Sequence, residues 1–198
     1  ERLRRYMLAG GGVLATGATG MLDAEGEPRT DHAVDRLLGI RREKIPPEEP
    51  YEADWEHYDF HNYMRVEDPA HPAMRPFTAT PLIPFGGRRQ PLVSREPYLS
   101  ALATYVPAFP IYPPEFAYMR TPRTPEPLLL AGENGHGGRV AVLAADIDRR
   151  YGEAALPDHG DLLASLTLWL LRDELPVRVE GPGYLAISLY AQEERRLL

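Results

Sequence analysis

The clearest hydrophobic pattern in the chain is a pair of unbroken apolar runs that lie far apart in the sequence. Val13 to Ala15 follows three glycines at 10–12, and Val140 to Ala145 follows Gly137 and Gly138. Apolar runs without polar alternation are typical of strands covered on both faces, as in a parallel sheet. Because glycine takes a left-handed conformation without a Cβ penalty, the first three glycines predict the end of a short basic helix.

Helical spacing predicts two further helices. Asp31 to Leu38 has a cap at Thr30 or Asp31 and a stop at Gly39. A longer helix is expected over His159 to Arg172, with Asp158 as its N-cap. Its broad apolar face consists of Leu162, Leu163, Leu166, Trp169 and Leu170.

The helix at the start of the chain and the strands at its end are predicted to pack against parts of the protein that this sequence does not contain. Pro176 to Glu180 and Tyr184 to Tyr190 are predicted as two strands that begin a separate β module. The opening helix is expected to face a sheet through Leu3, Tyr6 and Met7. We therefore expect this chain to be a fragment of a longer protein.

Between these regular parts lies a segment of different composition. Of the 21 prolines in the chain, 17 fall between Ile45 and Pro127, whereas only two of the 17 glycines do. Proline at this density forbids long helices and interrupts central strands. The segment also carries many aromatic residues, so its composition is not that of a disordered chain. It is predicted to be an ordered excursion of short strands and turns.

These patterns predict an α/β protein with four parts. The boundaries are 1–44 for the first part of the α/β domain, 45–130 for the proline- and aromatic-rich insertion, 131–175 for the closing part, and 176–198 for the start of a β module.

Charge and composition exclude several classes of partner. The net charge of −7 argues against nucleic acid, which needs a basic face, and no apolar run approaches the length of a membrane helix. The chain has no cysteine, which removes thiol nucleophiles, thiolate metal sites and disulfides. We expect a cytoplasmic protein, although the cysteine count alone leaves the compartment open.

One glycine motif resembles a nucleotide-binding loop but departs from it. Leu14 to Gly20 is similar to the loop of extended short-chain dehydrogenases, in which glycines let the backbone approach a pyrophosphate. The third glycine is replaced by Asp23, and the acidic stretch that follows is not the apolar start of a helix. We expect no dinucleotide and no other cofactor.

Three of the candidate ligand-binding residues lie close together in the first part of the insertion. His57, Asp59 and His61 would share one face of a strand. His57 and His61 do not complete a zinc-protease motif, because Tyr58 stands where that motif has glutamate. A solvated or substrate-facing edge is the preferred interpretation, and no metal is expected.

The other candidates are acidic or aromatic. Asp146 and Asp148 follow a predicted parallel strand, where open α/β sheets bind ligands. The alternative, which we favour, is that they pair with Arg149 and Arg150 or cap the next turn. Tyr112 and Glu115 flank two prolines, which would hold Glu115 for a contact to a ligand or to a neighbouring domain. A single glutamate cannot supply the pair of carboxylates of a glycosidase.

Longer stretches of the sequence resemble a known domain. The run GGGVLATGATGMLDAEGEPRTDHAVDRLLGI resembles the amidotransferase-like (β-galactosidase trimerisation-type) domain of bacterial glycoside hydrolases. The later GGRVAVLAADIDRRY, the helix that contains Trp169, and VRVEGPGYLAISLYAQ are similar to the closing part of that domain and the start of the β-sandwich behind it. YPPEFAY and TPRTPEPLLL also correspond to segments of such proteins. The resemblance covers both ends of the chain and parts of its middle.

This resemblance implies a partial flavodoxin-like sheet of the class I glutamine amidotransferase type, followed by the start of a β-sandwich. It also implies an accessory or oligomerisation domain that packs against a catalytic (β/α)₈ barrel outside this chain, in a homo-oligomeric protein. The parent would be a glycoside hydrolase, with no catalytic residue in this chain. Amidotransferase chemistry itself is excluded, because its nucleophile is a cysteine. A stand-alone module that binds a sugar or small ligand through the aromatic insertion remains the alternative.

Overall fold

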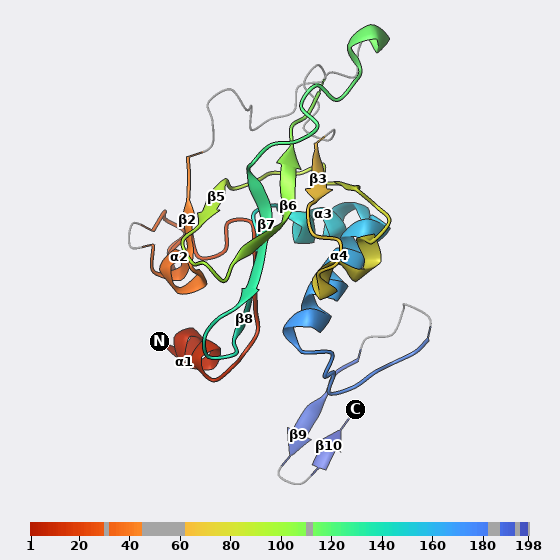
Figure 1. Ribbon diagram of the computed structural model, residues 1–198. Coiled ribbons are helices and arrows are strands. Elements are labelled where there is room, and N and C mark those ends of the chain that lie inside the picture. Colours follow the sequence, from red (N-terminus) through yellow and green to blue (C-terminus); the bar gives the residue numbers. More distant parts are fainter. Residues whose placement is uncertain (30–31, 45–61, 110–112, 182–186, 193–194, 198) are drawn as a thin grey trace.

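A six-stranded mixed sheet forms the centre of the computed structural model, which describes residues 1–29, 32–44, 62–109, 113–181, 187–192 and 195–197 (Figure 1). The strand order is β1-β8-β7-β6-β3-β4. β1 and β8 are parallel, and every other neighbouring pair is antiparallel. The strands are β1 (Val13–Thr16), β3 (Tyr63–Val66), β4 (Leu82–Pro84), β6 (Ser100–Val106), β7 (Pro127–Glu133) and β8 (Arg139–Leu143).

The mixed α/β class predicted from the sequence is confirmed, and the two apolar runs are neighbouring parallel strands as expected. Parallel pairing is nevertheless confined to these two strands. β7 and β8 pair antiparallel because the turn between them is tight, and so short a connection permits no parallel pairing. In that turn the Asn134 side chain accepts hydrogen bonds from the N–H groups of His136 and Gly138, both at 2.9 Å. Gly137 has a φ of 78°, which favours glycine.

Strands from the proline-rich segment extend this same sheet. β3, β4 and β6 come from residues 45–130 and β7 begins there, so part of the predicted excursion forms short strands that pair with one another and, through β7, with β8. Pro84 is the last residue of the edge strand β4, and Pro127 is the first residue of β7. At such positions the missing N–H of proline removes no hydrogen bond between strands.

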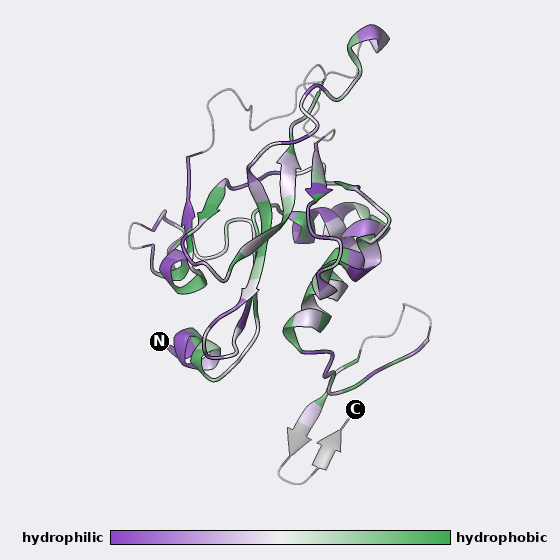
Figure 2. Cartoon of the chain, in the orientation of Figure 1, coloured by the Kyte–Doolittle hydropathy of each residue, from purple (hydrophilic) through white to green (hydrophobic). Residues whose placement is uncertain are grey.

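Helices and a small ribbon cover the two faces of the sheet (Figure 1). On one side are η2 (Pro72–Phe77), α3 (Ile147–Ala154) and α4 (Pro157–Leu170). On the other are α2 (Ala33–Leu38) and the antiparallel pair of β2 (Ile40–Arg42) with β5 (Leu92–Ser94). Figure 2 shows the central strands as largely apolar and the outer surfaces of the helices as polar.

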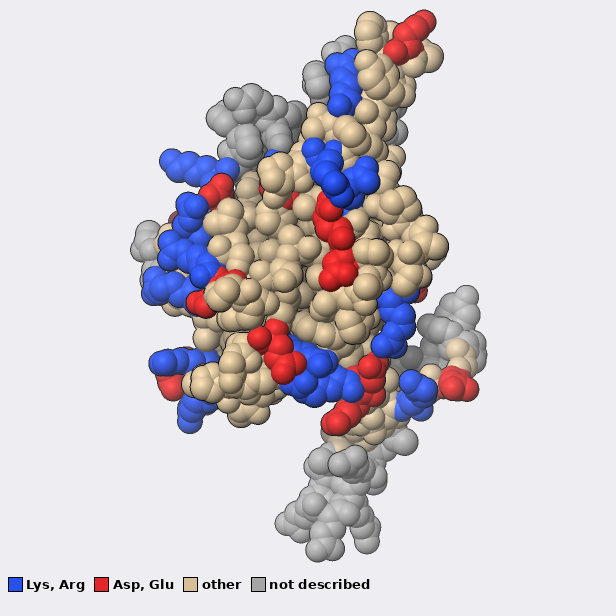
Figure 3. Space-filling view, in the orientation of Figure 1, with Lys and Arg blue, Asp and Glu red and all other residues tan. Residues whose placement is uncertain are grey.

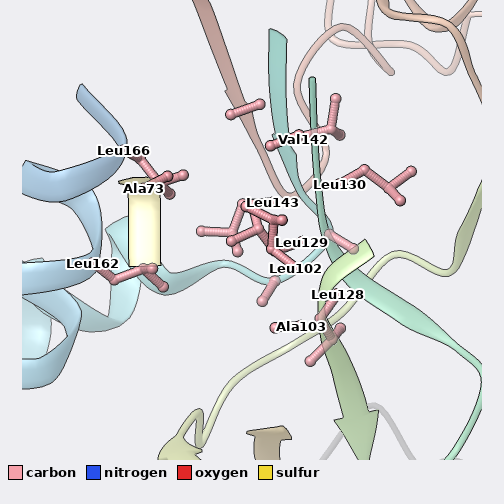
Figure 4. Close-up of a cluster of buried hydrophobic side chains, with 14 of the residues drawn as sticks. Ala73, Leu102, Ala103, Leu128, Leu129, Leu130, Val142, Leu143, Leu162 and Leu166 are labelled. Carbon is pink, nitrogen blue, oxygen red and sulfur yellow. The ribbon is translucent and has the colours of Figure 1, made fainter. Parts of the chain in front are cut away.

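The core lies on both faces of β7 and β8. In Figure 4, Leu143 points toward Leu162 and Leu166 of α4, whereas Leu130 and Val142 point the other way. All four apolar residues at the end of β8 are buried. This confirms the prediction that the second apolar run is a strand covered on both faces.

The first helix, α1 (Arg2–Leu8), ends where the glycines predicted. Gly10 has a φ of 88°, so the residue past the last turn is left-handed. Only part of the predicted inward face is correct: Met7 is buried, but Leu3 and Tyr6 are exposed.

The other helix boundaries differ from the predictions by a few residues. α2 ends at Gly39, whose φ of 73° confirms the predicted stop. α4 begins at Pro157, before the expected start, and its N-cap is Leu156, so the cap predicted at Asp158 is wrong. Proline at the first position needs no N–H partner and has the required φ, which moves the boundary toward the N-terminus.

The C-terminal strands are shorter than predicted. Residues 176–180 form no strand, and 187–189 are irregular before β9 (Tyr190–Gln192) pairs with β10 (Arg195–Leu197). The strand predicted over Pro176–Glu180 is therefore wrong, because no described neighbour supplies it with a hydrogen-bonding ladder. None of the helices in the described ranges is long and apolar enough to cross a membrane.

Candidate functional site

The carboxyl ends of β1 and β8 meet at one edge of the sheet, where the sequence predicted a ligand site. The two strands run in parallel register with Thr16 opposite Leu143, so the residues that follow them are neighbours. The Thr16 hydroxyl donates a 2.7 Å hydrogen bond to Oδ2 of Asp148. One predicted carboxylate is thus tied to the adjacent strand rather than directed at a ligand.

Both carboxylate oxygens of Asp146 have partners within the protein. Arg149 Nε donates to Oδ2 at 2.7 Å, and the backbone N–H of Arg88 donates to Oδ1 at 2.8 Å. The first of these bonds raises the pKa of Arg149 above its ordinary range, with further support from Glu153. The preferred interpretation of Asp146 as a partner of Arg149 is confirmed, whereas Asp148 bonds Thr16 and not the pair of arginines.

The segment that contains Arg88 lies directly along the end of β8. Gln90 N–H donates to the carbonyl of Ala144 at 2.8 Å, and Asp146 N–H donates to the carbonyl of Arg88 at 3.1 Å. Gly87 packs so closely that a Cβ there would overlap Oδ1 of Asp146. This segment therefore closes the approach to the Asp146 carboxylate from its own side.

A buried arginine fixes the loop after β1. Arg42 Nε donates to Oδ1 of Asp35 at 2.9 Å, and the same guanidinium donates to the backbone carbonyls of Gly17 and Thr19. Gly20 packs on Val34, where a Cβ would come within 2.7 Å of a methyl carbon. Gly20 thus serves chain packing, and within the described residues the next helix after this loop is α2.

A second polar cluster stands at the same end of the sheet, on neighbouring strands. Arg89 forms an ion pair with Glu126 and lies over the ring of Tyr105, with 4.2 Å between the guanidinium carbon and the ring centroid. The side chain of Arg89 is 5% exposed, so the cluster is an internal contact that joins the 86–90 segment to strand β6 and to Glu126, the residue before β7. Sequence analysis missed both clusters because their members are separated by long stretches of chain without a shared spacing.

Of the remaining predicted residues, Glu115 alone lies within the part of the chain that the structure describes. Glu115 belongs to η3 (Pro114–Phe116), in the long connection between β6 and β7, and is exposed. His57, Asp59, His61 and Tyr112 lie outside the described residues. Within the described ranges no group of three or more His, Asp or Glu side chains is arranged to hold a metal ion.

Comparison with known proteins finds distant likeness among solved structures. No protein-family model and no curated protein sequence matches the chain. Among solved structures, an exo-β-1,4-mannosidase from Opitutaceae bacterium strain TAV5 is similar with 16% sequence identity and a TM-score of 0.39. The match covers 85% of this chain and 22% of the mannosidase chain. The chain thus spans about a fifth of that structure's length.

The chemistry available at the described edge is limited by these contacts. A glycosidase needs an acid and a second carboxylate on either side of one glycosidic bond. Asp146 and Asp148 instead accept hydrogen bonds from a guanidinium, a backbone amide and a hydroxyl of the same chain. Their arrangement stabilises the junction of β1, β8 and the 86–90 segment.

Proposed function

We propose that this chain is a non-catalytic accessory and oligomerisation domain of a carbohydrate-active glycoside hydrolase. In this proposal it belongs to the amidotransferase-like, β-galactosidase trimerisation type, with a flavodoxin-like sheet that further strands complete. It packs against a catalytic barrel that these 198 residues do not include. The resemblance of the segments around Gly10–Ile40 and Gly137–Tyr151 supports this assignment.

The observation that carries the proposal is the internal use of the two carboxylates at the sheet edge. Asp146 bonds Arg149 and the Arg88 amide, and Asp148 bonds Thr16. Carboxylates held in this way act as structural ties between elements. A scaffold that presents its surface to a catalytic partner needs such ties and needs no general acid of its own.

A specific observation favours one alternative function. Phe116 and Tyr118, in the connection between β6 and β7, are more than half exposed, so they are available to bind a ligand. The alternative is a stand-alone α/β module that binds a sugar or another small ligand. The natural reading frame separates the two proposals: a barrel-coding region favours the accessory domain, and a reading frame limited to this domain favours the module.

Hydrolysis assays test the accessory role directly. We expect the whole gene product to hydrolyse aryl glycosides and the 198-residue chain to be inactive. Asp146→Asn and Asp148→Asn in the whole protein should keep their rate within about twofold of the unmodified enzyme at a temperature where both are folded, because neither residue touches substrate.

An active 198-residue chain would contradict the proposal. The decisive variant is then Glu115→Gln, because Glu115 is the exposed acid that the sequence singled out. Loss of that activity in Glu115→Gln, with an unchanged melting temperature, would place a catalytic group in this chain.

A further inference from the structure

The structure divides the aromatic residues of the proline-rich segment into two groups. Phe77, Phe85 and Tyr105 are buried in the core. Phe116 and Tyr118 are 51% and 56% exposed. The first group fills the interior, as most aromatic residues do, so only the second is available to bind something else.

The two exposed rings belong to a segment that projects from the body of the protein. This segment, residues 107–126 between β6 and β7, is called the arm below (Figure 1). Figure 3 shows it as an extension whose surface is mostly neither Lys or Arg nor Asp or Glu. Residues 114–118, which form the tip of the arm, are all exposed, so the tip does not pack on the sheet.

The base of the arm is tied to the sheet. Arg65 Nε donates to the carbonyl of Pro122 at 2.6 Å, and Arg123 pairs with Glu67 at 2.8 Å. The Thr124 hydroxyl donates to the carbonyl of Tyr105 at 2.6 Å. These bonds hold residues 122–124, where the arm returns to the sheet.

The tip itself is ordered by local contacts. Pro113 and Pro114 restrict the backbone before Phe116, and the Tyr118 N–H donates to the Phe116 carbonyl at 2.9 Å. The guanidinium carbon of Arg120 lies 5.7 Å from the Phe116 ring centroid and 5.6 Å from that of Tyr118. One cation thus orients both rings.

The size of this aromatic surface indicates what it can bind. A buried aromatic side chain covers about 150–250 Å², so two half-exposed rings offer roughly 200 Å². A stable protein interface needs about 800 Å² from each partner. The ring pair is much too small for that, but it matches the faces of one or two pyranose rings.

We propose that the arm tip, formed by Phe116, Tyr118 and Arg120, is a contact platform for a glycan chain. The C–H faces of the sugar rings stack on the aromatic rings, and the guanidinium donates hydrogen bonds to sugar hydroxyls. Among the described residues Arg120 forms no ion pair, which keeps its N–H groups available for this contact. The inference rests on the proposed function, in which the parent protein acts on carbohydrate.

Native affinity electrophoresis of the whole gene product tests this platform. The gels contain increasing amounts of a soluble β-mannan, xylan or mixed-linkage glucan, and the same proteins are assayed on a small aryl glycoside. The variants are Phe116→Ala/Tyr118→Ala and a matched control, Tyr6→Ala, because Tyr6 is an equally exposed aromatic residue, at 51%, on α1.

We expect at least one glycan to retard the unmodified protein and the control equally. The double variant should bind that glycan about tenfold more weakly while its rate on the aryl glycoside is unchanged. Equal retardation of the double variant, or no retardation of any protein, overturns the proposal. A lower oligomeric mass of the double variant in sedimentation also overturns it, because the tip would then be a protein interface.

Glycosidase activity tests the accessory role, and glycan retardation tests the platform, so the two proposals can fail independently. A whole gene product without glycosidase activity contradicts the accessory role. Glycan retardation that depends on Phe116 and Tyr118 would still support the platform in that case.

Discussion

At the scale of single residues, buried charge defines the interior of the carboxyl edge. Arg42 and Asp35 have side chains that are 5% and 9% exposed, and their ion pair holds the loop after β1 to α2 and β2. Arg41, the adjacent residue, pairs with Glu43 in solvent, with side chains 53% and 42% exposed. Removal of the Arg42 side chain should therefore lower the free energy of unfolding much more than removal of the neighbouring Arg41 side chain.

Arg42→Ala should lower the free energy of unfolding by about 3–5 kcal/mol, because it leaves the Asp35 carboxylate and two loop carbonyls without their buried donor. Arg41→Ala should cost less than about 1 kcal/mol, since exposed ion pairs contribute little. Urea unfolding of the two variants measures the difference. Equal losses would show that the buried pair does not hold this loop.

His71 should make stability depend on pH. Burial lowers the pKa of His71 below its ordinary value of 6.5, with Arg139 acting in the same direction and Asp68 opposing. As the pH falls, the unfolded chain therefore takes up the proton first, and the free energy of unfolding decreases from about pH 6.5 down to the lowered folded pKa. Above that range the contribution is fully present.

The matched variant is His71→Asn, which can still accept the N–H of Ala73, a bond of 3.1 Å in the structure, but does not titrate. Urea midpoints at about pH 7.5 and about pH 5 should fall less in this variant than in the unmodified chain. Parallel declines would assign the pH dependence to other groups.

At the scale of elements, close packing decides where the sheet tolerates a side chain. Gly132 in β7 lies against the backbone of Tyr98, and a Cβ there would overlap the Tyr98 carbonyl oxygen. Gly135, in the turn after β7, has no atom within 4 Å of the corresponding position. The two glycines are three residues apart but have opposite surroundings.

Gly132→Ala should destabilise the protein by about 1–3 kcal/mol, because the strand must move away from its neighbour. Gly135→Ala should be close to neutral, since its φ is not left-handed and the added methyl group meets nothing. Thermal melting of both variants provides the comparison. A stable Gly132→Ala protein would mean that β7 and the Tyr98 segment are farther apart than the structure has them.

At the scale of the whole molecule, the described sheet ends in an unpaired strand and several large apolar side chains are exposed. β1 is an edge strand of the described sheet, and large hydrophobic residues are exposed over several elements. They include Leu3, Tyr6, Leu8, Leu22, Phe116, Tyr118, Leu171 and Leu175. Unpaired edges and exposed apolar groups favour association.

The isolated 198-residue chain should therefore self-associate or be only marginally stable. Sedimentation velocity should show a mass that rises with concentration, whereas the whole gene product should have one defined oligomeric mass. A 198-residue chain that stays monomeric and melts in one cooperative transition would contradict this expectation.

Local patterns alone determined several features of this protein. The second apolar run specifies a buried strand, whereas the first forms an edge strand with only Ala15 buried; Gly10 and Gly39 specify helix ends, and the proline density of the middle segment excludes long helices. Each of these depends on backbone sterics or on burial of one short stretch. Such properties are contained in a few consecutive residues and can therefore be predicted without the rest of the chain.

Only the tertiary structure decided how these elements combine. It brought Thr16 to Asp148, Arg88 to Asp146 and Arg42 to the loop after β1, contacts between residues 132, 58 and 25 or 23 positions apart. It also placed the strands of the proline-rich segment in the main sheet and left Phe116 and Tyr118 exposed. Pairing across such separations depends on loop closure and on competition for the same buried surface, which no local spacing records.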